Sequence, residues 1–329
     1  MNKKILLIDV DSKIPNIALM KISTFYKNKG YIVDLKKLDY TYYPKERNQC
    51  IINAEEYEKV FVSIIFKINK NVVGVINGKE VYFGGVGYSL KDNLPKEIEQ
   101  CKKDYSLYPN NDCSFGFISR GCIRNCYFCV VPKKEGMIHQ VNNVDDIVEH
   151  KKVILMDNNI LALKNHLEIL TELRDKKIKC QFNQGIDIRL INDKNAKLLS
   201  ELRYIGEYFF AFDNKKDELL IQDKLNLFKK YLSKDWKVKM FLYCHPDMDI
   251  IDDVVYRVNW CKRNKVLPYL MRDSSCWNSK NRDFYIDLCA YCNQVNLFKK
   301  MSFDDFMQKR TNNIFRRNKS IKLFKGDER

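Results

Sequence analysis

The sequence contains no run of apolar residues near the roughly 20 that a helix needs to cross a bilayer. Its first ten residues superficially resemble a secretion signal, because Lys3 and Lys4 precede the apolar run Ile5–Ile8. That run is too short for a signal peptide, Asp9 and Asp11 interrupt it, and no small-residue cleavage site follows it. We therefore expect a first β-strand here, a cytoplasmic protein, and no membrane partner.

Low-complexity segments and short internal repeats are also absent. Hydrophobic residues make up 45% and charged residues 30% of the 329, so the chain is expected to be globular rather than disordered. Twelve cysteines are many for a sequence without a secretion signal, and in a chain of this size they do not indicate a disulfide scaffold. Metal ligation is the favoured interpretation of a cysteine cluster, and chance that of an isolated cysteine.

The formal net charge is +16, which is compatible with a polyanionic partner such as nucleic acid. Lysines outnumber arginines, however, and they are scattered along the chain among many Asn and Ile residues. An AT-rich genome produces the same pattern without any functional reason. A nucleic-acid partner stays open, but the compositional explanation is preferred.

Residues 1–110 alternate between strand and helix patterns. Strands are expected at Lys4–Asp9, Tyr31–Leu35, Val60–Phe66 and Val81–Phe83, and a helix at Ile17–Lys29, ending at Gly30. This alternation favours a Rossmann-like domain with a parallel, doubly wound sheet. The last strand runs into Gly84-Gly85-Val86-Gly87, where glycine lets the backbone turn tightly or approach a ligand. Pro95–Asn111 has the composition of a linker.

Residues 111–277 contain a second series of strands and helices. Strands are expected at Phe115–Ser119, Val153–Met156, Cys180–Phe182, Tyr208–Phe212, Val238–Tyr243 and Val266–Met271, and helices at Ile160–Lys177, Asp193–Leu202, Asp217–Leu232 and Asp252–Asn264. Six strand–helix repeats in about 160 residues are typical of a partial (β/α)6 barrel. Residues 278–329 are expected to form a helical C-terminal extension with a basic tail. The predicted fold class is therefore α/β, with a smaller Rossmann-like domain before the partial barrel.

The strongest motif lies in the loop Arg120–Cys129. Three residues separate Cys122 from Cys126, and two separate Cys126 from Cys129. Three thiolates on a short loop suit three corners of a cubane iron–sulfur cluster, and the fourth iron is left open for chemistry. The loop follows the first strand of the second series, at the carboxyl end where barrel enzymes place their chemistry. A structural zinc site would need a fourth ligand, and the nearest histidine, His139, has no distinctive spacing.

This spacing, with the aromatic Phe128 before the last cysteine, resembles the hallmark of the radical S-adenosylmethionine superfamily. The resemblance covers about Ser114–Ser274. It implies a radical S-adenosylmethionine barrel and a 4Fe–4S cluster on Cys122, Cys126 and Cys129, with S-adenosylmethionine chelated to the open iron. It also implies reductive cleavage to a 5′-deoxyadenosyl radical that abstracts hydrogen from a substrate, with an external electron donor such as a flavodoxin or ferredoxin. The sequence does not identify the substrate.

The segment after the second strand of the series matches a cofactor-binding position of that family. Asp157, Asn158 and Asn159 stand where the family commonly has Gly-Gly-Glu, so they match in position and polarity but not in identity. The resemblance implies that they contact the methionyl ammonium. Asp157 is alternatively an N-cap for the helix expected to start near Ile160.

The segment after the third strand is a further candidate. Gln184, Asp187 and Arg189 surround a glycine at the expected barrel mouth, and Arg189 is suited to bind a ligand carboxylate. An internal pair between Asp187 and Arg189 is an equally good explanation. Asp213 and Arg272, which follow later strands, are weaker candidates.

The N-terminal region resembles the cobalamin-binding domain that precedes many barrels of the same superfamily. Ser63 and Gly84-Gly85 stand about where that domain contacts the nucleotide tail of cobalamin. The usual motif Asp-x-His-x-x-Gly is missing, because Asp9–Lys13 contains no histidine. Ligation of cobalt from this loop is therefore excluded, cobalamin is not expected, and a degenerate domain for packing or substrate recognition is favoured.

Other functions fit these motifs less well. Val130–Gly136 resembles the methylthiotransferase branch, whose front domain holds a second cluster on three cysteines, but the spacing of Cys50, Cys101 and Cys113 does not match. No RNA-binding domain of that branch is found after the barrel. Methylthiolation and cobalamin-assisted methyl transfer are minority alternatives. A non-catalytic iron–sulfur regulator or nucleic-acid-binding protein is the alternative of another class.

Two C-terminal features have simple explanations. Cys289 and Cys292 lie in an expected helix, where cysteines serve as small core residues, although with Cys276 they also suggest an auxiliary cluster. Lys309–Lys325 carries seven basic residues and no acidic one, with aromatic residues between them. Such a segment can bind phosphates and stack on bases, but a solvated or partly docked tail is favoured.

Overall fold

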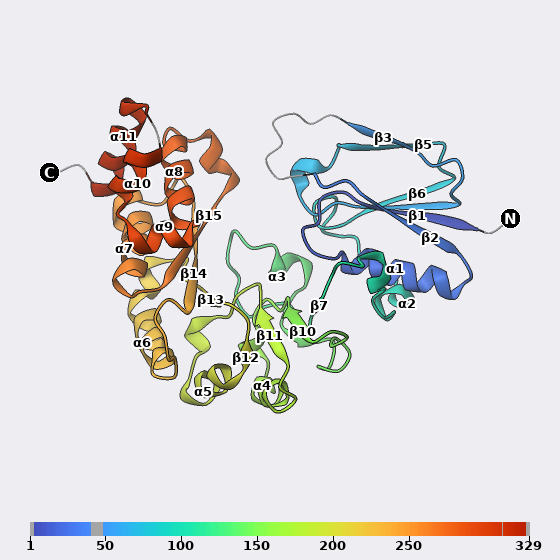
Figure 1. The fold of residues 1–329 in the computed structure, drawn as a ribbon, viewed down its shortest axis with the longest axis horizontal. Helices are drawn as coiled ribbons and strands as arrows, with labels where there is room; N and C mark the ends of the chain where they lie inside the picture. Colours follow the sequence, from blue (N-terminus) through green and yellow to red (C-terminus); the bar gives the residue numbers. More distant parts are fainter. Residues whose placement is uncertain (1–2, 41–48, 311, 327–329) are drawn as a thin grey trace. The chain divides into compact units, whose positions relative to one another are not determined.

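The computed structural model describes residues 3–40, 49–310 and 312–326, and it divides into two compact units (Figure 1). The first unit is Met1–Phe115 and the second is Gly116–Arg329. Both units combine parallel sheets with helices, which confirms the predicted α/β class. None of the helices in the described ranges is long and apolar enough to cross a membrane.

The first unit is built on a four-stranded parallel sheet. In spatial order its strands are β2 (Ile32–Lys37), β1 (Lys4–Asp9), β4 (Lys59–Ser63) and β6 (Glu80–Gly84). Alternate side chains of a strand point to opposite faces of a sheet. Ile5 and Leu7 of β1 therefore pack with α1 (Ile17–Asn28) and α2 (Lys96–Glu99), whereas Leu6 contributes to the core on the other face.

That other face is covered in a way that the sequence did not predict. β3 (Cys50–Asn53) and β5 (Val73–Ile76) form a two-stranded parallel sheet whose Ile52 joins the same core as Leu6. Within the described residues, strands rather than a helix cover this face. The arrangement therefore differs from the doubly wound pattern that was expected.

The second unit contains two larger parallel sheets. In spatial order, the strands of the first sheet are β12 (Arg203–Tyr204), β11 (Lys179–Phe182), β10 (Lys152–Leu155) and β7 (Cys113–Gly116). The boundary between the two units falls within β7. The strands of the second sheet are β13 (Tyr208–Ala211), β14 (Val238–Cys244) and β15 (Leu267–Arg272). A single parallel bridge between Ile186 and Phe210 links the two sheets. The pairing of the described strands therefore gives two sheets and not one continuous barrel wall. β8 (Ser119–Arg120) precedes the cysteine motif and β9 (His139–Gln140) follows it, and the two strands form a short antiparallel pair.

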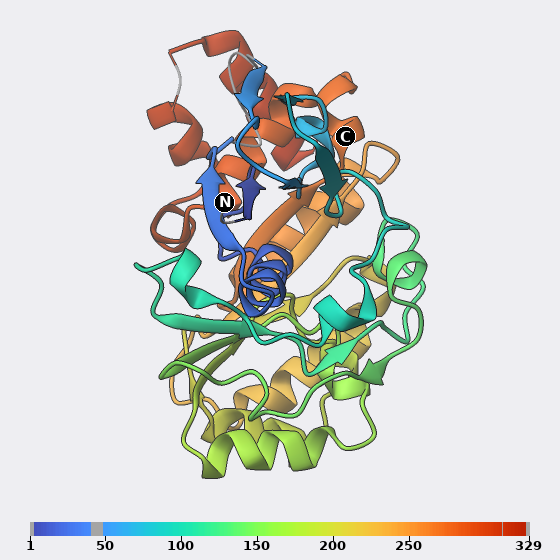
Figure 2. The ribbon, with the colours of Figure 1, turned by 90° about the vertical axis from the view of Figure 1, so that its right-hand side faces the viewer.

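Helices lie between these strands along the chain or follow the last of them. They are α3 (Val131–Lys134), α4 (His166–Asp175), α5 (Asp193–Glu201), α6 (Glu218–Lys229), α7 (Tyr256–Arg263), α8 (Arg282–Cys292), α9 (Val295–Lys300), α10 (Phe303–Arg310) and α11 (Ile314–Lys325). Figure 1 and Figure 2 both show α4, in yellow-green, alongside the sheet that contains β10 and β11. The C-terminal helices share one hydrophobic core with the strands, through side chains such as Phe298 and Phe306.

Two of the expected helices are interrupted. The helix expected over Ile160–Lys177 is a single 3-10 turn followed, after the extended residue Leu163, by α4. Its first apolar side chains are buried directly in the core and do not follow helical spacing. The expected helix that contains Cys289 and Cys292 breaks at Asn293, whose side chain exchanges hydrogen bonds with the backbone of Leu270 in β15.

The basic tail is folded and docked within the second unit. Asp287 of α8 is 1% exposed, and it accepts hydrogen bonds from Arg316 Nη2 at 2.7 Å and Arg310 Nε at 3.2 Å. Ser320 of α11 donates a third bond, at 2.8 Å. Two of the seven basic residues therefore neutralise a buried carboxylate, and their charges are paired inside the fold.

Candidate functional site

The cysteine loop, residues 120–129, lies at the carboxyl ends of strands from both sheets of the second unit. Arg124 Nε, inside the loop, is 2.7 Å from Asp187 Oδ2, which follows β11. The ring of Phe128 stacks on that of Tyr243 at the end of β14, with centroids 3.9 Å apart and planes at 12°. These contacts place the predicted cysteines where parallel α/β folds carry their ligands.

The start of the loop depends on a glycine and a glutamate. Gly121 has φ +82°, and a Cβ atom there would lie 2.4 Å from the carbonyl oxygen of Met137, so only glycine fits. Glu135 accepts a hydrogen bond from Gly121 N at 2.9 Å and pairs with Arg120 at 2.7 Å. Asn158 Nδ2 donates to the same carboxylate at 2.6 Å. Asn158 therefore holds the loop in place from the end of β10.

The thiols of Cys122, Cys126 and Cys129 are half-buried. Burial raises the pKa of the Cys126 thiol, and the negative charges of Asp213 and Cys129 raise it further. Burial likewise raises the pKa of the Cys129 thiol, with a contribution from Cys122. In the part of the chain that the structure describes, no set of three or more His, Cys, Asp and Glu side chains is already arranged as a metal site.

Asn159 is a buried polar side chain next to the loop, with one atom left unsatisfied. It is 1% exposed, and its Nδ2 donates to Cys122 Sγ at 3.6 Å. Its Oδ1 has no hydrogen-bond partner among the described residues. Leaving a buried acceptor unpaired costs about 1–3 kcal/mol, so this oxygen is available to accept a hydrogen bond from a ligand. A ligand ammonium or hydroxyl group beside Cys122 would satisfy it.

The carboxylate of Asp157 binds groups of the protein itself. Asp157 is fully buried, and its carboxylate accepts hydrogen bonds from Ser119 N at 2.5 Å, Ser119 Oγ at 2.6 Å and Ile118 N at 3.3 Å. Burial raises its pKa to about 6 in spite of these bonds. Asp157 thus fixes the backbone that leads from β7 into the cysteine loop, and it caps no helix.

The raised pKa of Asp157 predicts a pH dependence of stability. Because the folded protein holds this proton more tightly than the unfolded chain, where the pKa is near 3.8, the free energy of unfolding falls as pH rises from about 4 to about 6. Asp157→Asn removes this titration. The stability of the unchanged protein relative to the variant is therefore expected to drop by up to about 3 kcal/mol between pH 4 and pH 7. Denaturant titrations across this range measure the difference; a constant difference would contradict the assignment.

The candidates after β11 form an internal ion-pair network. Burial alone would raise the pKa of Asp187, but hydrogen bonds from Arg189 and Arg124 hold it below the usual value. Arg189 Nε lies 2.7 Å from Asp187, and its Nη1 lies 3.0 Å from Asp217. The internal pair is therefore the arrangement adopted here. Gln184 is exposed and makes no hydrogen bond within the described residues, so its side chain is available to a ligand.

The weaker candidates lie at other strand ends. Asp213 accepts a hydrogen bond from Tyr243 N at 3.0 Å, and Tyr243 donates its hydroxyl to Asp273 at 2.8 Å. The guanidinium of Arg272 lies 4.6 Å from the ring of Trp277. Tyr243 was missed from the sequence, although its position at the end of an expected strand was a usable signal. The roles of Arg124 and Glu135 had no such signal, because their partners are distant in sequence.

The residues of the first unit that resemble cobalamin contacts instead make hydrogen bonds and packing contacts within that unit. Ser63 accepts a hydrogen bond from Asn16 at 2.8 Å, and the buried Asp11 accepts one from Ile65 N at 2.8 Å. Gly85, with φ +94°, allows close packing, because a Cβ atom there would lie 2.3 Å from the carbonyl oxygen of Ile64. The glycine run therefore packs against the loop after β4.

Most of the remaining cysteines lie on different elements, although Cys276 donates to the carbonyl oxygen of Cys244 at 3.6 Å. Cys50 lies on β3, Cys113 on β7, and Cys101, after α2, donates to a backbone carbonyl of that helix. Cys292 is 1% exposed in the core, and Cys289 donates to the carbonyl of Leu270. Among the described residues, none of these cysteines belongs to a group that could hold a metal.

Comparison with known proteins adds no family. No family model matches the chain, and no curated protein sequence is significantly similar to it. The protein is thus defined by its own features: it is an α/β protein with parallel sheets and a three-cysteine loop at their carboxyl ends.

Proposed function

We propose that this protein is a radical S-adenosylmethionine enzyme with a 4Fe–4S cluster on Cys122, Cys126 and Cys129. The observation that carries the proposal is the unsatisfied Oδ1 of Asn159, buried beside the Cys122 thiol on a docked three-cysteine loop. In this proposal the two parallel sheets of the second unit are parts of one partial barrel, joined at Ile186.

The residues present fit the cofactors. Three thiols at one strand-end loop are the soft ligands that iron–sulfur clusters require, and they leave one iron open. When bound, the cluster supplies one electron that cleaves S-adenosylmethionine into methionine and a 5′-deoxyadenosyl radical, which abstracts hydrogen from the substrate. The side chains of the site bind, orient and shield these groups.

Each neighbouring side chain has a role in this proposal. Asn159 accepts a hydrogen bond from the methionyl ammonium and thereby orients the cofactor. The stacked rings of Phe128 and Tyr243 exclude water from one side of the loop. Tyr127, 71% exposed, marks the surface that an electron donor such as a flavodoxin or ferredoxin approaches. Gln184 is free to contact the cofactor or the substrate.

The main experiment is anaerobic reconstitution with iron and sulfide, followed by reductant and S-adenosylmethionine. We expect about four irons per chain and formation of 5′-deoxyadenosine, measured by liquid chromatography and mass spectrometry. Four irons without 5′-deoxyadenosine would instead favour a non-catalytic iron–sulfur regulator. Failure to retain iron would contradict the proposal.

Replacing Asn159 with Leu tests the ammonium contact. A hydrogen bond to a charged group contributes about 1.5–3 kcal/mol, so the affinity for S-adenosylmethionine is expected to fall by about 10- to 150-fold. Iron content should not change, because Asn159 is not a cluster ligand. Asn226→Leu, on the exposed surface of α6, is the matched control. Equal affinities of the two variants would argue against this role of Asn159.

A further inference from the structure

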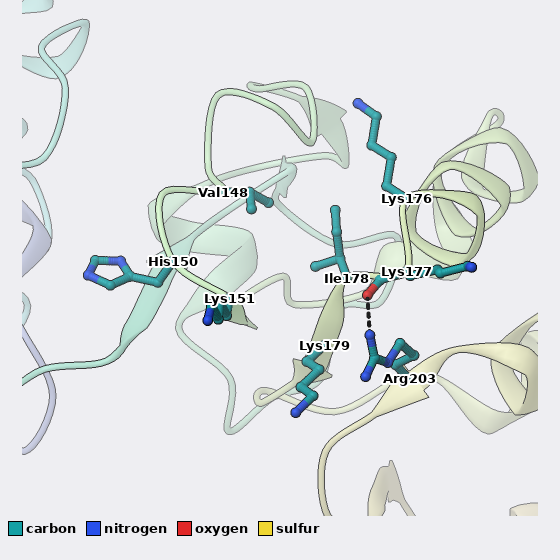
Figure 3. Close-up of a pocket in the computed structure, with 8 residues that line it drawn as sticks. All are labelled: Val148, His150, Lys151, Lys176, Lys177, Ile178, Lys179 and Arg203. Carbon is teal, nitrogen blue, oxygen red and sulfur yellow. Dashed lines mark hydrogen bonds between the residues drawn. The ribbon is translucent and has the colours of Figure 1, made fainter.

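A separate cavity of about 350 Å3 lies in the second unit, away from the cysteine loop. Its lining comes from the amino-terminal ends of β11 and β12, from the end of α4 and from the segment before β10 (Figure 3). The lining residues are Val148, His150, Lys151, Lys176, Lys177, Ile178, Lys179 and Arg203. The cysteine loop contacts carboxyl ends of strands, so this cavity, the lysine pocket, belongs to the opposite edge of the sheet.

The lysine pocket has excess positive charge. Five exposed cationic side chains and no acidic one line it. Of the five, Lys176 is paired with Asp145 and Glu172, at 2.6 Å each. Arg203 donates at 3.4 Å to the carbonyl of Lys177 and forms no ion pair with the described residues.

Three of the lysines have no partner at all within the described residues. The Nζ atoms of Lys151, Lys177 and Lys179 make no ion pair or hydrogen bond there. Figure 3 shows Lys151, Lys179 and Arg203 on one side of Ile178, with Lys176 pointing away from them. Like charges gathered without counter-charges destabilise a fold, and an anion bound among them removes that penalty.

The backbone at this pocket is also unfavourable. Lys177 has φ +53°, in the left-handed region, at the end of α4. Glycine is the usual residue in that conformation, and a residue with a Cβ atom costs roughly 1 kcal/mol more there. The sequence therefore places a cation at the pocket in a position where glycine would be more stable.

The lining chemistry defines the class of ligand. Besides the cations it contains His150 and two aliphatic residues, and it has no aromatic side chain on which a base could stack. Amine and guanidinium groups in a small open cavity match phosphate oxygens. We propose that the lysine pocket binds a ligand with two or more adjacent phosphate groups, recognised through the phosphates alone. The ligand is a small polyphosphate or the backbone of a nucleic-acid strand.

The test removes three charges from the pocket of the full-length protein. The pocket variant is Lys151→Gln, Lys179→Gln and Arg203→Gln; the control, with the same loss of charge, is Lys194→Gln, Lys197→Gln and Lys234→Gln, all exposed outside the pocket. Binding of inorganic tripolyphosphate is measured by calorimetry at about 0.15 M salt. Binding of a fluorescein-labelled single strand of about 20 nucleotides is measured by anisotropy.

Tripolyphosphate affinity is expected to fall by at least about tenfold in the pocket variant and by much less in the control. If the strand also binds and tripolyphosphate displaces it, the phosphates come from nucleic acid. If only tripolyphosphate binds, a small polyphosphate is the source. Equal losses in both variants, or no binding by the unchanged protein below about 1 mM, would overturn the proposal. Unfolding curves of the variants check that each remains folded.

Discussion

Replacing Cys122, Cys126 and Cys129 together with Ala is expected to abolish reconstituted iron and 5′-deoxyadenosine formation. The stability of the apoprotein should hardly change, because the thiols are half-buried and the loop is held by other groups. Those groups are the Arg124–Asp187 ion pair and the stacked ring of Phe128. Iron and sulfide assays measure the first effect, and denaturant unfolding of the apoprotein measures the second.

The matched control replaces Cys50, Cys101 and Cys113 with Ala. These cysteines are also half-buried, but they lie on separate elements of the chain. Iron content should stay near four per chain in this control. A fall from about eight irons in the unchanged protein to about four in this variant would instead indicate a second cluster, as in the methylthiotransferase branch. Full iron in the loop variant would contradict the proposed cluster.

Replacing Arg310 and Arg316 with Met is expected to lower the free energy of unfolding by about 3–5 kcal/mol. The cause is the carboxylate of Asp287, which is 1% exposed and would keep, among the described residues, only the hydroxyl of Ser320 as a side-chain partner. Chemical denaturation followed by circular dichroism measures the loss.

Adding Asp287→Leu to the double variant should restore most of that stability, because the buried charge is then removed with its partners. Arg317→Met on the same helix is the control, with an expected change below about 1 kcal/mol. A double variant as stable as this control would show that the carboxylate does not depend on the two arginines.

The docking of the tail also changes how a nucleic-acid role is tested. Deleting 309–329 removes Arg310, Arg316 and Ser320, so Asp287 would lose all the side-chain partners described for it. Weaker binding after such a deletion could arise from unfolding alone. Point substitutions of exposed charges separate binding from folding.

The positions of many strands along the chain were predictable from runs of apolar residues. The expected strand Lys4–Asp9 agrees at both ends, and Val238–Tyr243 differs from β14 by one residue. Buried parallel strands such as these are short, continuous apolar runs bounded by polar residues, which a sequence displays directly.

The elements that were missed depend on distant contacts. β3 and β5 are four residues each, and exposed residues such as Ile51 interrupt their pattern. The break at Asn293 arises because its amide pairs with Leu270 in β15. Neither interaction has a local signal, since the partners lie more than 20 residues away.

The candidate site was likewise predictable only in part. The three cysteines were predicted from their spacing, their place after a strand and the neighbouring Phe128, and Asn159 from the family resemblance. The sequence could not distinguish Asn159, with an unsatisfied oxygen, from Asp157, whose carboxylate is consumed by backbone amides. That distinction depends on which atoms the fold brings together.

The ion pair between Arg124 and Asp187 has a consequence for the lifetime of the protein. In many small metal sites the metal organises the chain, and its loss unfolds the protein. Here the ion pair and the ring of Phe128 hold the loop without iron, so damage to the proposed cluster by oxygen would leave a folded chain. Repair of the proposed cluster would then need only new iron and sulfide, without resynthesis of the polypeptide.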